Sequence, residues 1–451
     1  MSRTNWAGNL IYGAERTVAP ATVADAQEAV RGAAKLRVVG SRHCFNDIAD
    51  TTGTQLSLEH LKGVVSLDTA RQQVTVEGGI RYSDLSPYLH ERGYALHNLA
   101  SLPHITVAGA CATATHGSGV TLGNLATAVA AIQFIDAAGD LVSLSRDGDP
   151  DVFPGAPVSL GALGVITRLT LDLQPTFSMR QDVYRDLPVK TLVANFDEIM
   201  PSGYSVSLFT GWQGDAVEQA WIKNKVEAGA APAMSPSFFG ARPATEKMHP
   251  IAGCDPLNST EQMGAVGPFY DRLPHFRIDA VPAGGDDYQV EYFLPIEHAP
   301  AAVEALHGWG HHLAPLLMVS EVRAIAEDKL WLSPCYRQPC VAFHFSFKPD
   351  EPGIRRLLPG LEEVLAPFAP RPHWGKLFTM APQVVRSRYE KLGAFRDLLD
   401  AHDPRGKFRN AFVDRYIFGW RPRQYHAFSR SAYGSPAHPP LQALPRRCRA
   451  G

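Results

Sequence analysis

The segment from Ala100 to Gly123 constrains the fold more than any other part of this chain. Within it, residues 101–119 read SLPHITVAGACATATHGSG, so few side chains are bulky and small or hydroxyl-bearing residues dominate. Such a segment lets the backbone come close to whatever packs against it. It suits a backbone pressed against a large flat ligand that carries a pyrophosphate. On its own, the pattern is equally compatible with close packing between two segments of the protein.

A second motif follows a short predicted strand, Leu36 to Val39, which runs into Gly40-Ser41-Arg42-His43. A strand that ends in Gly-Ser exposes several backbone N–H groups in a small concavity, and such nests bind phosphate. A histidine in this place can attack an activated carbon, because neutral imidazole is a good nucleophile. The motif alone leaves open that His43 is an ordinary loop histidine.

Composition indicates a globular protein with more than one structural unit. The chain has 451 residues, of which 45% are hydrophobic and 20% charged. A net charge of -2 gives it no electrostatic reason to bind nucleic acid or a membrane. The opening MSRTNWAGNLIYGAERT lacks the pattern of a secretory signal. The six cysteines form no C-x-x-C pair, so we expect free thiols and a cytoplasmic location.

The pattern of helices and strands predicts an α+β protein. Thr22 with Asp25 resembles a helix N-terminus, and Ser83 is expected to cap a helix over 83–92. After Pro175 the strands become longer and more aromatic; the predicted ones are Ser205 to Thr210, Gln289 to Leu294, Val319 to Ile325 and Val341 to Phe347. The tail, 421–451, has six arginines and no acidic residue, which favours disorder; docking to an acidic partner is the alternative.

Together the two motifs resemble the vanillyl-alcohol oxidase family of FAD enzymes, and most closely its alditol-oxidising members. The matching pattern is G-S-x-H-x-F-N, then A-S-L-P-H-I-T-V-A-G, then T-H-G-S-G, and the similarity runs from Asn5 to Phe412. It implies a two-domain VAO/PCMH-type fold. Residues 1–180 and 380–420 would bind FAD, and residues 181–379 would form a substrate domain built on a large antiparallel sheet.

The resemblance also implies where FAD would lie. His43 would carry a covalent bond to the flavin 8α-methyl group, whereas no second link is proposed for Cys44. The family usually has Gly where this chain has Arg42, a departure that matters if the position needs a positive φ. The residues implied in cofactor binding are Val38, Val39, Gly40, Ser41, Arg42, His43, Cys44, Ser101, Thr106, Gly109, Thr113, Ala114, Thr115, His116, Ile166 and His373.

Polar residues share the faces of two predicted strands. Glu321 and Arg323 lie two residues apart, as do His344 and Ser346, so each pair points to one side. Charged groups on apolar strands need partners, and a cross-strand ion pair on a solvated face would provide them. The resemblance implies instead that Ser101, Glu321, Arg323 and Ser346 hold the hydroxyls of a polyol, with Lys376 at the reacting alcohol.

The implied reaction is oxidation of a terminal alcohol of an alditol, such as xylitol or sorbitol, to the aldose by a monomeric enzyme. Hydride would pass to flavin N5, and O2 would be reduced to H2O2. Arg323 and Lys376 would stabilise a developing alkoxide, and His344 and Glu321 are candidates for accepting its proton.

Two other functions are also compatible with the sequence. One is a sugar-1,4-lactone oxidase or dehydrogenase of the same family, and Ala100, beside the expected flavin contact, does not decide between oxidase and dehydrogenase. The other is a non-catalytic protein that binds flavin or a partner. The sequence contains no G-x-G-x-x-G after a strand and no H-E-x-x-H motif, so neither a Rossmann site nor a zinc site is expected.

Overall fold

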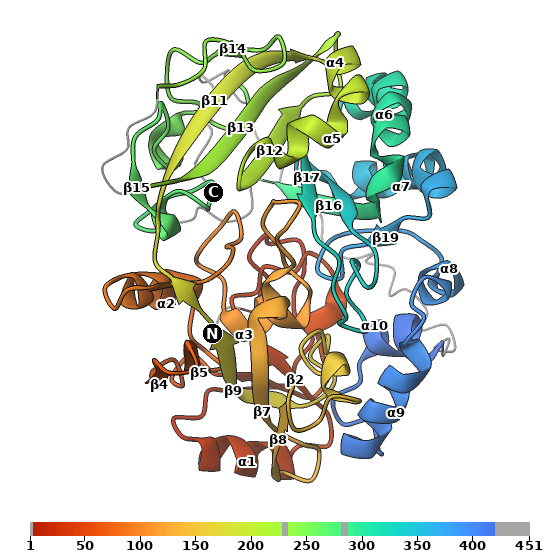
Figure 1. Ribbon diagram of the computed structural model, residues 1–451. Helices are drawn as coiled ribbons and strands as arrows, with labels where there is room; N and C mark the ends of the chain where they lie inside the picture. The colour runs from red at the N-terminus through yellow and green to blue at the C-terminus, as the bar shows by residue number, and fades with distance from the viewer. Residues whose placement is uncertain (1–2, 228–232, 281–286, 420–451) are drawn as a thin grey trace, which may run out of the picture.

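The computed structural model describes residues 3–227, 233–280 and 287–419. Figure 1 shows two parts: a lower one formed by the N-terminal third and the end of the described chain, and an upper one built on a large twisted sheet. The mixed content of helices and strands and the large antiparallel sheet confirm the predicted fold class. The tail 421–451 lies outside the described residues.

The lower part contains a parallel sheet and an antiparallel sheet. The parallel sheet has the order β1-β3-β2 and consists of β1 (Arg16–Val18), β3 (Thr54–Ser57) and β2 (Leu36–Val39). The antiparallel sheet has the order β4-β5-β9-β7-β8 and consists of β4 (Val64–Asp68), β5 (Gln73–Glu77), β9 (Val165–Asp172), β7 (Val129–Ile135) and β8 (Leu141–Ser145). A further pair, β6 (Tyr94–Ala95) and β10 (Gln174–Pro175), leads toward the upper part.

One of the two predicted helix N-termini is confirmed, and the cap predicted for the other is not. Helix α1 (Val23–Gly32) begins at a capping box, in which Thr22 and Asp25 each accept a backbone N–H of the other at 3.1 Å. Helix α2 (Tyr82–His90) starts one residue before Ser83, so the predicted cap is wrong. The N–H of Ser83 instead donates to the carbonyl of Pro103 at 2.9 Å, because a neighbouring segment supplies the acceptor.

The upper part is a nine-stranded sheet. Its order is β14-β11-β13-β12-β17-β18-β16-β19, with β15 beside β11. The strands are β14 (Arg242–Pro243), β11 (Ser178–Pro188), β13 (Ala216–Val226), β12 (Ser205–Thr210), β17 (Leu317–Ile325), β18 (Cys340–Phe347), β16 (Tyr288–Pro295), β19 (Arg371–Pro372) and β15 (Gly267–Pro268). The four strands predicted after Pro175 are confirmed as β12, β16, β17 and β18.

The two faces of this sheet differ in polarity. Residues such as Val322 and Phe343 belong to the main hydrophobic core together with side chains of four helices. These helices are α4 (Val189–Ala194), α5 (Phe196–Ile199), α6 (Ala299–Leu313) and α7 (Glu351–Leu365). The alternate residues of the same strands include Glu321, Arg323 and His344, so the face opposite the helices carries the polar groups.

The end of the described chain returns to the lower part (Figure 1). It contains α8 (Pro382–Ser387), α9 (Leu392–His402) and α10 (Ala411–Val413). The N–H of Leu36 donates to the carbonyl of Lys407 at 2.9 Å, and the fully buried Arg37 donates to the carbonyl of Phe408 at 2.8 Å. We propose on these contacts that residues 380–419 complete the unit formed by residues 3–180.

The cysteines differ in part from expectation. Cys44, Cys111, Cys335 and Cys340 are free thiols, as predicted. Cys254 is disulfide-bonded, so the prediction is wrong for this residue, and Cys448 lies outside the described residues. Spacing along the chain cannot show which distant cysteines meet in the fold.

None of the described helices is long and apolar enough to cross a membrane; the longest, α6 and α7, have 15 residues each.

Candidate active site

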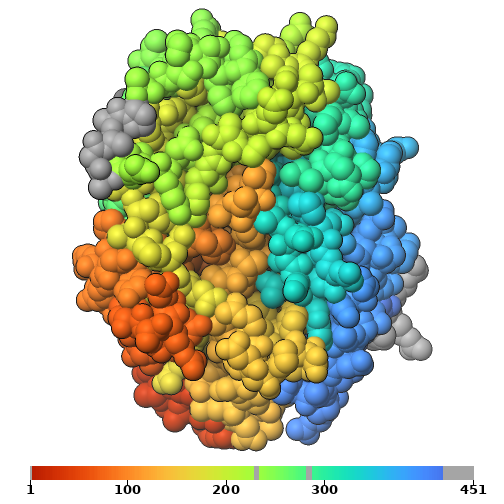
Figure 2. All heavy atoms as spheres, viewed as in Figure 1, coloured from red at the N-terminus to blue at the C-terminus, as the bar shows by residue number. Residues whose placement is uncertain are grey.

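A cavity of about 580 Å³ lies between the two parts of the molecule. Its wall combines the loop 38–44, the small-residue segment, the polar face of the large sheet and the loop 373–376. Figure 2 shows the outer face hollowed where the orange chain, around residue 100, is recessed between the yellow and cyan parts. All residues that the sequence assigns to the substrate line this cavity, namely Ser101, Glu321, Arg323, His344, Ser346 and Lys376.

Most of the residues assigned to the cofactor line the same cavity. They are Val38, Val39, Gly40, Ser41, Arg42, His43, Cys44, Ser101, Thr106, Gly109, Thr113, Thr115, His116 and His373. Ala114 and Ile166 are not among the residues that line it, and both are buried, at 1% and 6% exposure. The small-residue segment and the Gly-Ser loop are therefore brought together, although they are about 60 residues apart in the sequence.

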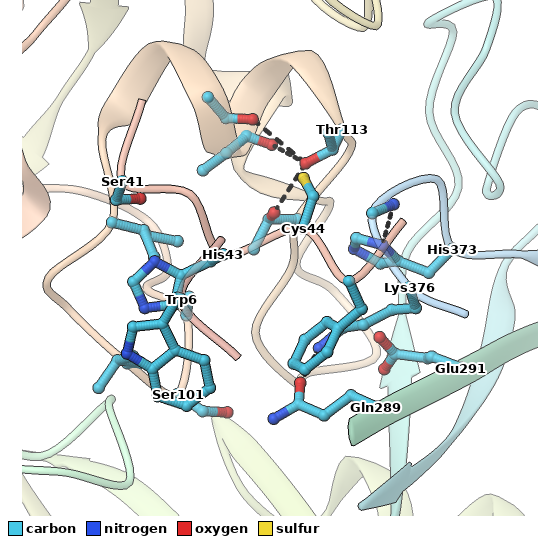
Figure 3. Close-up of a pocket in the computed structure, with 18 of the residues that line it drawn as sticks. Trp6, Ser41, His43, Cys44, Ser101, Thr113, Gln289, Glu291, His373 and Lys376 are labelled. Carbon is cyan, nitrogen blue, oxygen red and sulfur yellow. Dashed lines mark hydrogen bonds between the residues drawn. The ribbon is translucent and has the colours of Figure 1, made fainter. Parts of the chain in front are cut away.

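His43 is half-buried, and both of its ring nitrogens are shielded from solvent. Its ring stacks on Trp6, with centroids 4.9 Å apart and planes at 20° (Figure 3). Neither ring nitrogen has a side-chain hydrogen-bond partner among the described residues, and the backbone of Ser41 is the polar group beside the ring. Burial lowers the pKa of His43 to about 3, so the imidazole is neutral at physiological pH. An unprotonated, unpaired ring nitrogen facing a cavity is the form that can act as a nucleophile.

Arg42 has φ 63, in the left-handed region that favours glycine. This is the position at which the family usually has Gly. Arg42 adopts this backbone conformation although it is not glycine, and its carbonyl accepts a hydrogen bond from the N–H of Trp6 at 2.8 Å. A non-glycine residue in this region costs of order 1 kcal/mol, so the loop geometry is kept at some expense in stability.

The small-residue segment packs on the first loop more tightly than the sequence indicates. A Cβ atom on Gly40 would overlap the hydroxyl oxygen of Thr106, so the loop and the segment touch backbone to side chain. The segment also contains a helix that the sequence did not predict, α3 (Val107–Ala112), which begins after Thr106. Both roles considered for the small residues therefore apply. Some of them face the cavity, and others let this segment pack closely against the first loop.

Strand register explains the polar wall. Glu291 on β16, His344 on β18 and Glu321 on β17 are directly paired neighbours across three adjacent strands. One row further along, Gln289 pairs with Ser346. The side chains of each row point the same way. The sheet therefore presents one imidazole with one carboxylate on each side of it. The proposed alternative of a solvated face is wrong, because Glu321 and Arg323 are only 4% and 6% exposed.

Arg323 connects the two carboxylates. Its Nη2 lies 2.5 Å from Glu291 Oε1, and its Nε lies 3.5 Å from Glu321 Oε2. Glu291 also accepts a hydrogen bond from His116 at 3.1 Å, and Glu321 accepts one from His275 at 2.7 Å. Ser101 Oγ lies 3.5 Å from Arg323 Nη1, which brings a residue of the lower part to the same cluster.

The electrostatics of the cluster keep the carboxylates charged and the imidazole neutral. Burial opposes ionisation of Glu291 and Glu321, but Arg323 and nearby histidines hold the pKa of both well below the usual range. Burial, followed by the charge of Lys376, lowers the pKa of His344 to about 3. Burial lowers the pKa of Lys376 as well.

Lys376 lies opposite the His43 side of the cavity. Figure 3 shows it beside Gln289 and Glu291, with His43 and Trp6 across from them. Its ammonium donates to the side-chain oxygen of Gln289. Its loop is fixed to the first one, since Asn46 Nδ2 donates to the carbonyl of Lys376 at 2.8 Å and Phe45 N–H donates to that of Gly375 at 2.7 Å.

Sequence reasoning missed several residues of this site, among them Trp6, His275, Gln289 and Glu291. A signal existed for Glu291, a carboxylate at an inward position of the otherwise apolar strand β16. No local signal marks His275, which lies in a loop before a segment outside the described residues, or Trp6 near the N-terminus.

Two family models match the chain. One is described as an FAD binding domain and matches residues 14–145; the other is described as D-arabinono-1,4-lactone oxidase and matches residues 286–416. An alditol oxidase of a Streptomyces species is 43% identical over 92% of this chain and 99% of that protein. An L-gulono-1,4-lactone dehydrogenase of Mycobacterium tuberculosis is 29% identical over 92% of this chain and 98% of that protein.

The chain belongs to the vanillyl-alcohol oxidase family of FAD enzymes.

Solved structures agree with this family fold. A cholesterol oxidase from B. sterolicum has a TM-score of 0.72 at 15% identity, covering 92% of this chain and 96% of that one. A glucooligosaccharide oxidase from Acremonium strictum has a TM-score of 0.71 at 13% identity, covering 91% of this chain and 94% of that one. As a member of the vanillyl-alcohol oxidase family, this protein is an FAD-dependent oxidase acting on CH–OH donors, so the non-catalytic alternative is wrong.

The cavity residues fit FAD. The neutral His43 and the concave Gly40–Cys44 loop lie on one side, where Gly109 has no side chain and Thr113 a short one, which leaves room for a large ligand. The polar sheet face lies on the other side, within the same cavity. The site therefore has a cofactor wall and a separate polar wall on which a second, smaller molecule can lie.

Proposed function

We propose that this enzyme oxidises the terminal alcohol of an alditol, such as xylitol or sorbitol, to the aldose, with O2 reduced to H2O2. The observation that carries the proposal is the polar wall of the cavity. Ser101, Glu321, Arg323, Ser346 and Lys376 all face one buried space, and they offer both donors and acceptors. A substrate with several hydroxyl groups would satisfy these groups, whereas a simple alcohol would leave them unpaired.

The bound FAD supplies the hydride acceptor for such an oxidation. The protein side chains have the remaining tasks, which are to orient the alcohol and to stabilise its charge. Lys376 and Arg323 place positive charge beside the reacting hydroxyl, where negative charge develops as the proton leaves. Ser101, Ser346 and Glu321 would hold the more distant hydroxyls and so fix the carbon that reacts.

We propose His344 rather than Glu321 as the group that accepts the proton. His344 is neutral, buried and central in the row between the two carboxylates. Glu321 is already committed to His275 and Arg323, which stabilise its ionised form and make it a weak base. Burial and Lys376 lower the pKa of His344 to about 3, but Glu291 and Glu321 on either side raise it, so His344 remains a stronger base than Glu321.

A sugar 1,4-lactone is the alternative substrate. The model matching residues 286–416 and the mycobacterial relative support it. We favour the alditol, because the alditol oxidase relative is 43% identical and the lactone dehydrogenase only 29%. We also propose O2 as the electron acceptor, since the small Ala100 lines the cavity beside Ser101 and does not obstruct it.

A substrate comparison tests this function. Purified enzyme is mixed without oxygen with xylitol, sorbitol or L-gulono-1,4-lactone, and the flavin absorbance is followed. We expect the alditols to bleach the flavin faster than the lactone, and admission of O2 to yield about one H2O2 per aldose formed. Bleaching by the lactone alone would contradict the alditol proposal, and reoxidation only by an added dye would contradict the proposal that O2 accepts the electrons.

We further propose that FAD is joined covalently to His43. The Acremonium oxidase is described as having an 8α-N1-histidyl, 6-S-cysteinyl FAD, and the free nitrogens of His43 support a histidyl link here. Cys44 is a weaker candidate for a second link, because burial raises the pKa of its thiol to about 11.

Acid precipitation tests the bond to His43. We expect the yellow colour to stay with precipitated wild-type protein and to pass into the supernatant for His43→Ala, which lacks the nucleophile but keeps the rest of the cavity. His104→Ala, which removes a nearby histidine that hydrogen-bonds the carbonyl of Ile278, is the matched control and should retain bound colour. Free flavin released from the wild type would rule out the link.

Replacing Lys376 tests the proposed alkoxide stabilisation. We expect Lys376→Ala to slow anaerobic flavin reduction by xylitol by about 10²–10³-fold, the usual loss for a transition-state charge. Lys348→Ala removes an exposed lysine of the same part of the molecule and should react at the wild-type rate. A Lys376→Ala enzyme that reduces its flavin within about threefold of wild type would remove this residue from the chemistry.

A further inference from the structure

A buried lysine lies behind the polar wall, and none of the roles described above uses it. Lys223 on β13 is fully buried, with 0% exposure. Its ammonium donates to the carbonyls of Leu273 at 2.6 Å and Pro274 at 3.0 Å, and it lies 3.2 Å from His275 Nδ1. An ammonium has three N–H donors, so these three contacts use all of them. Burying a lysine is costly, and these bonds alone do not explain why a charge is needed here.

His275 connects this lysine to the wall of the cavity. Its Nδ1 faces Lys223, and its Nε2 lies 2.7 Å from Glu321 Oε1. The ring is held in place by the edges of two aromatic rings, with centroids 5.3 Å from Phe209 and 5.4 Å from Trp221. The imidazole can therefore neither turn nor move without losing these contacts.

The contacts decide where the hydrogen of the imidazole lies. With Lys223 protonated, Nδ1 accepts from the ammonium, so the ring hydrogen is on Nε2 and is donated to Glu321. If the proton moves from Lys223 to the ring, Nε2 still carries a hydrogen. Burial lowers the pKa of His275 to about 4 and that of Lys223 to about 7, so a proton shared by the two groups stays on Lys223 and not on the ring. The other charged or titratable groups facing this chain are Arg272, Arg323 and His344.

The backbone of His275 holds a second residue of the wall. The N–H groups of His275 and Phe276 both donate to the carbonyl of Ser101, at 3.0 and 3.2 Å. Ser101 belongs to the lower part of the molecule, whereas Glu321 is on the large sheet. The segment His275-Phe276 therefore fixes the two substrate-facing groups relative to each other, through the side chain of His275 on Glu321 and through the backbone of both residues on Ser101.

We propose that Lys223 and His275 are positioning residues that hold Glu321 ionised and in one orientation for a substrate hydroxyl. The proposal rests on the proposed function, in that Glu321 must contact the substrate. It assigns the Lys223–His275–Glu321 chain a part in substrate affinity and not in hydride transfer. Neither residue needs to touch the substrate.

Variants of His275 test the proposal by rapid-mixing reduction of the intact flavoenzyme. His275→Phe keeps a ring between Phe209 and Trp221 but cannot donate to Glu321, so the apparent Kd for substrate should rise about tenfold, while the limiting rate of flavin reduction falls less. His275→Gln keeps an N–H donor near the Nε2 position and should recover most of the affinity. Lys225→Met, which removes the next lysine on the same face of β13, is the control and should leave both constants unchanged.

A double-mutant cycle shows whether the effect passes through Glu321. In a Glu321→Gln background, His275→Phe should change the apparent Kd by less than about threefold. An equal loss in both backgrounds, or a His275→Phe enzyme with wild-type affinity, would overturn the proposal. If His275→Phe does not accumulate as a folded flavoprotein, Lys223→Met is read in the same cycle with the same criteria.

The substrate for this cycle is whichever of xylitol and L-gulono-1,4-lactone bleaches the wild-type flavin faster. Failure of the alditol proposal is thus seen in the wild-type enzyme, and failure of the positioning proposal is seen only in the variants.

Discussion

The buried ion pairs of Arg323 with Glu291 and Glu321 are the interaction on which the site depends. Two carboxylates within reach of one cavity would not both stay ionised away from water without a cation between them. Arg323 lies 2.5 Å from one and 3.5 Å from the other, and each carboxylate has a further histidine donor. Each charged group in the cluster therefore has defined partners, and only the atoms without such a partner are left to bind a substrate.

The geometry of this cluster comes from the sheet and not from loops. Because Glu291, His344 and Glu321 are paired across adjacent strands, their spacing is set by strand pairing. The groups that face them come from loops of the lower part, and these are fixed by bonds between the parts, such as Asn46 to Lys376 and His275 to Ser101. A rigid wall with loops anchored to it is an arrangement that holds reacting groups in place.

Much of this could be predicted from residue pattern, and the remainder has physical reasons for being missed. Alternation in Val319 to Ile325 predicted β17 and the shared face of Glu321 and Arg323, and Thr22 with Asp25 predicted the capping box of α1. The cap at Ser83 was wrong because an acceptor from a distant segment replaced it. His275 and Trp6 were missed because only the folded chain brings them beside Glu321 and His43.

The central claim is that the polar wall binds the several hydroxyl groups of one substrate. The most direct measurement compares kcat/KM for xylitol with that for pentane-1,5-diol, which has the same carbon chain without the internal hydroxyls. The account predicts a loss of about 10²-fold or more for the diol, because buried donors and acceptors would lose their partners. Equal kcat/KM for the two compounds would contradict it, since the wall would then contribute no hydroxyl recognition.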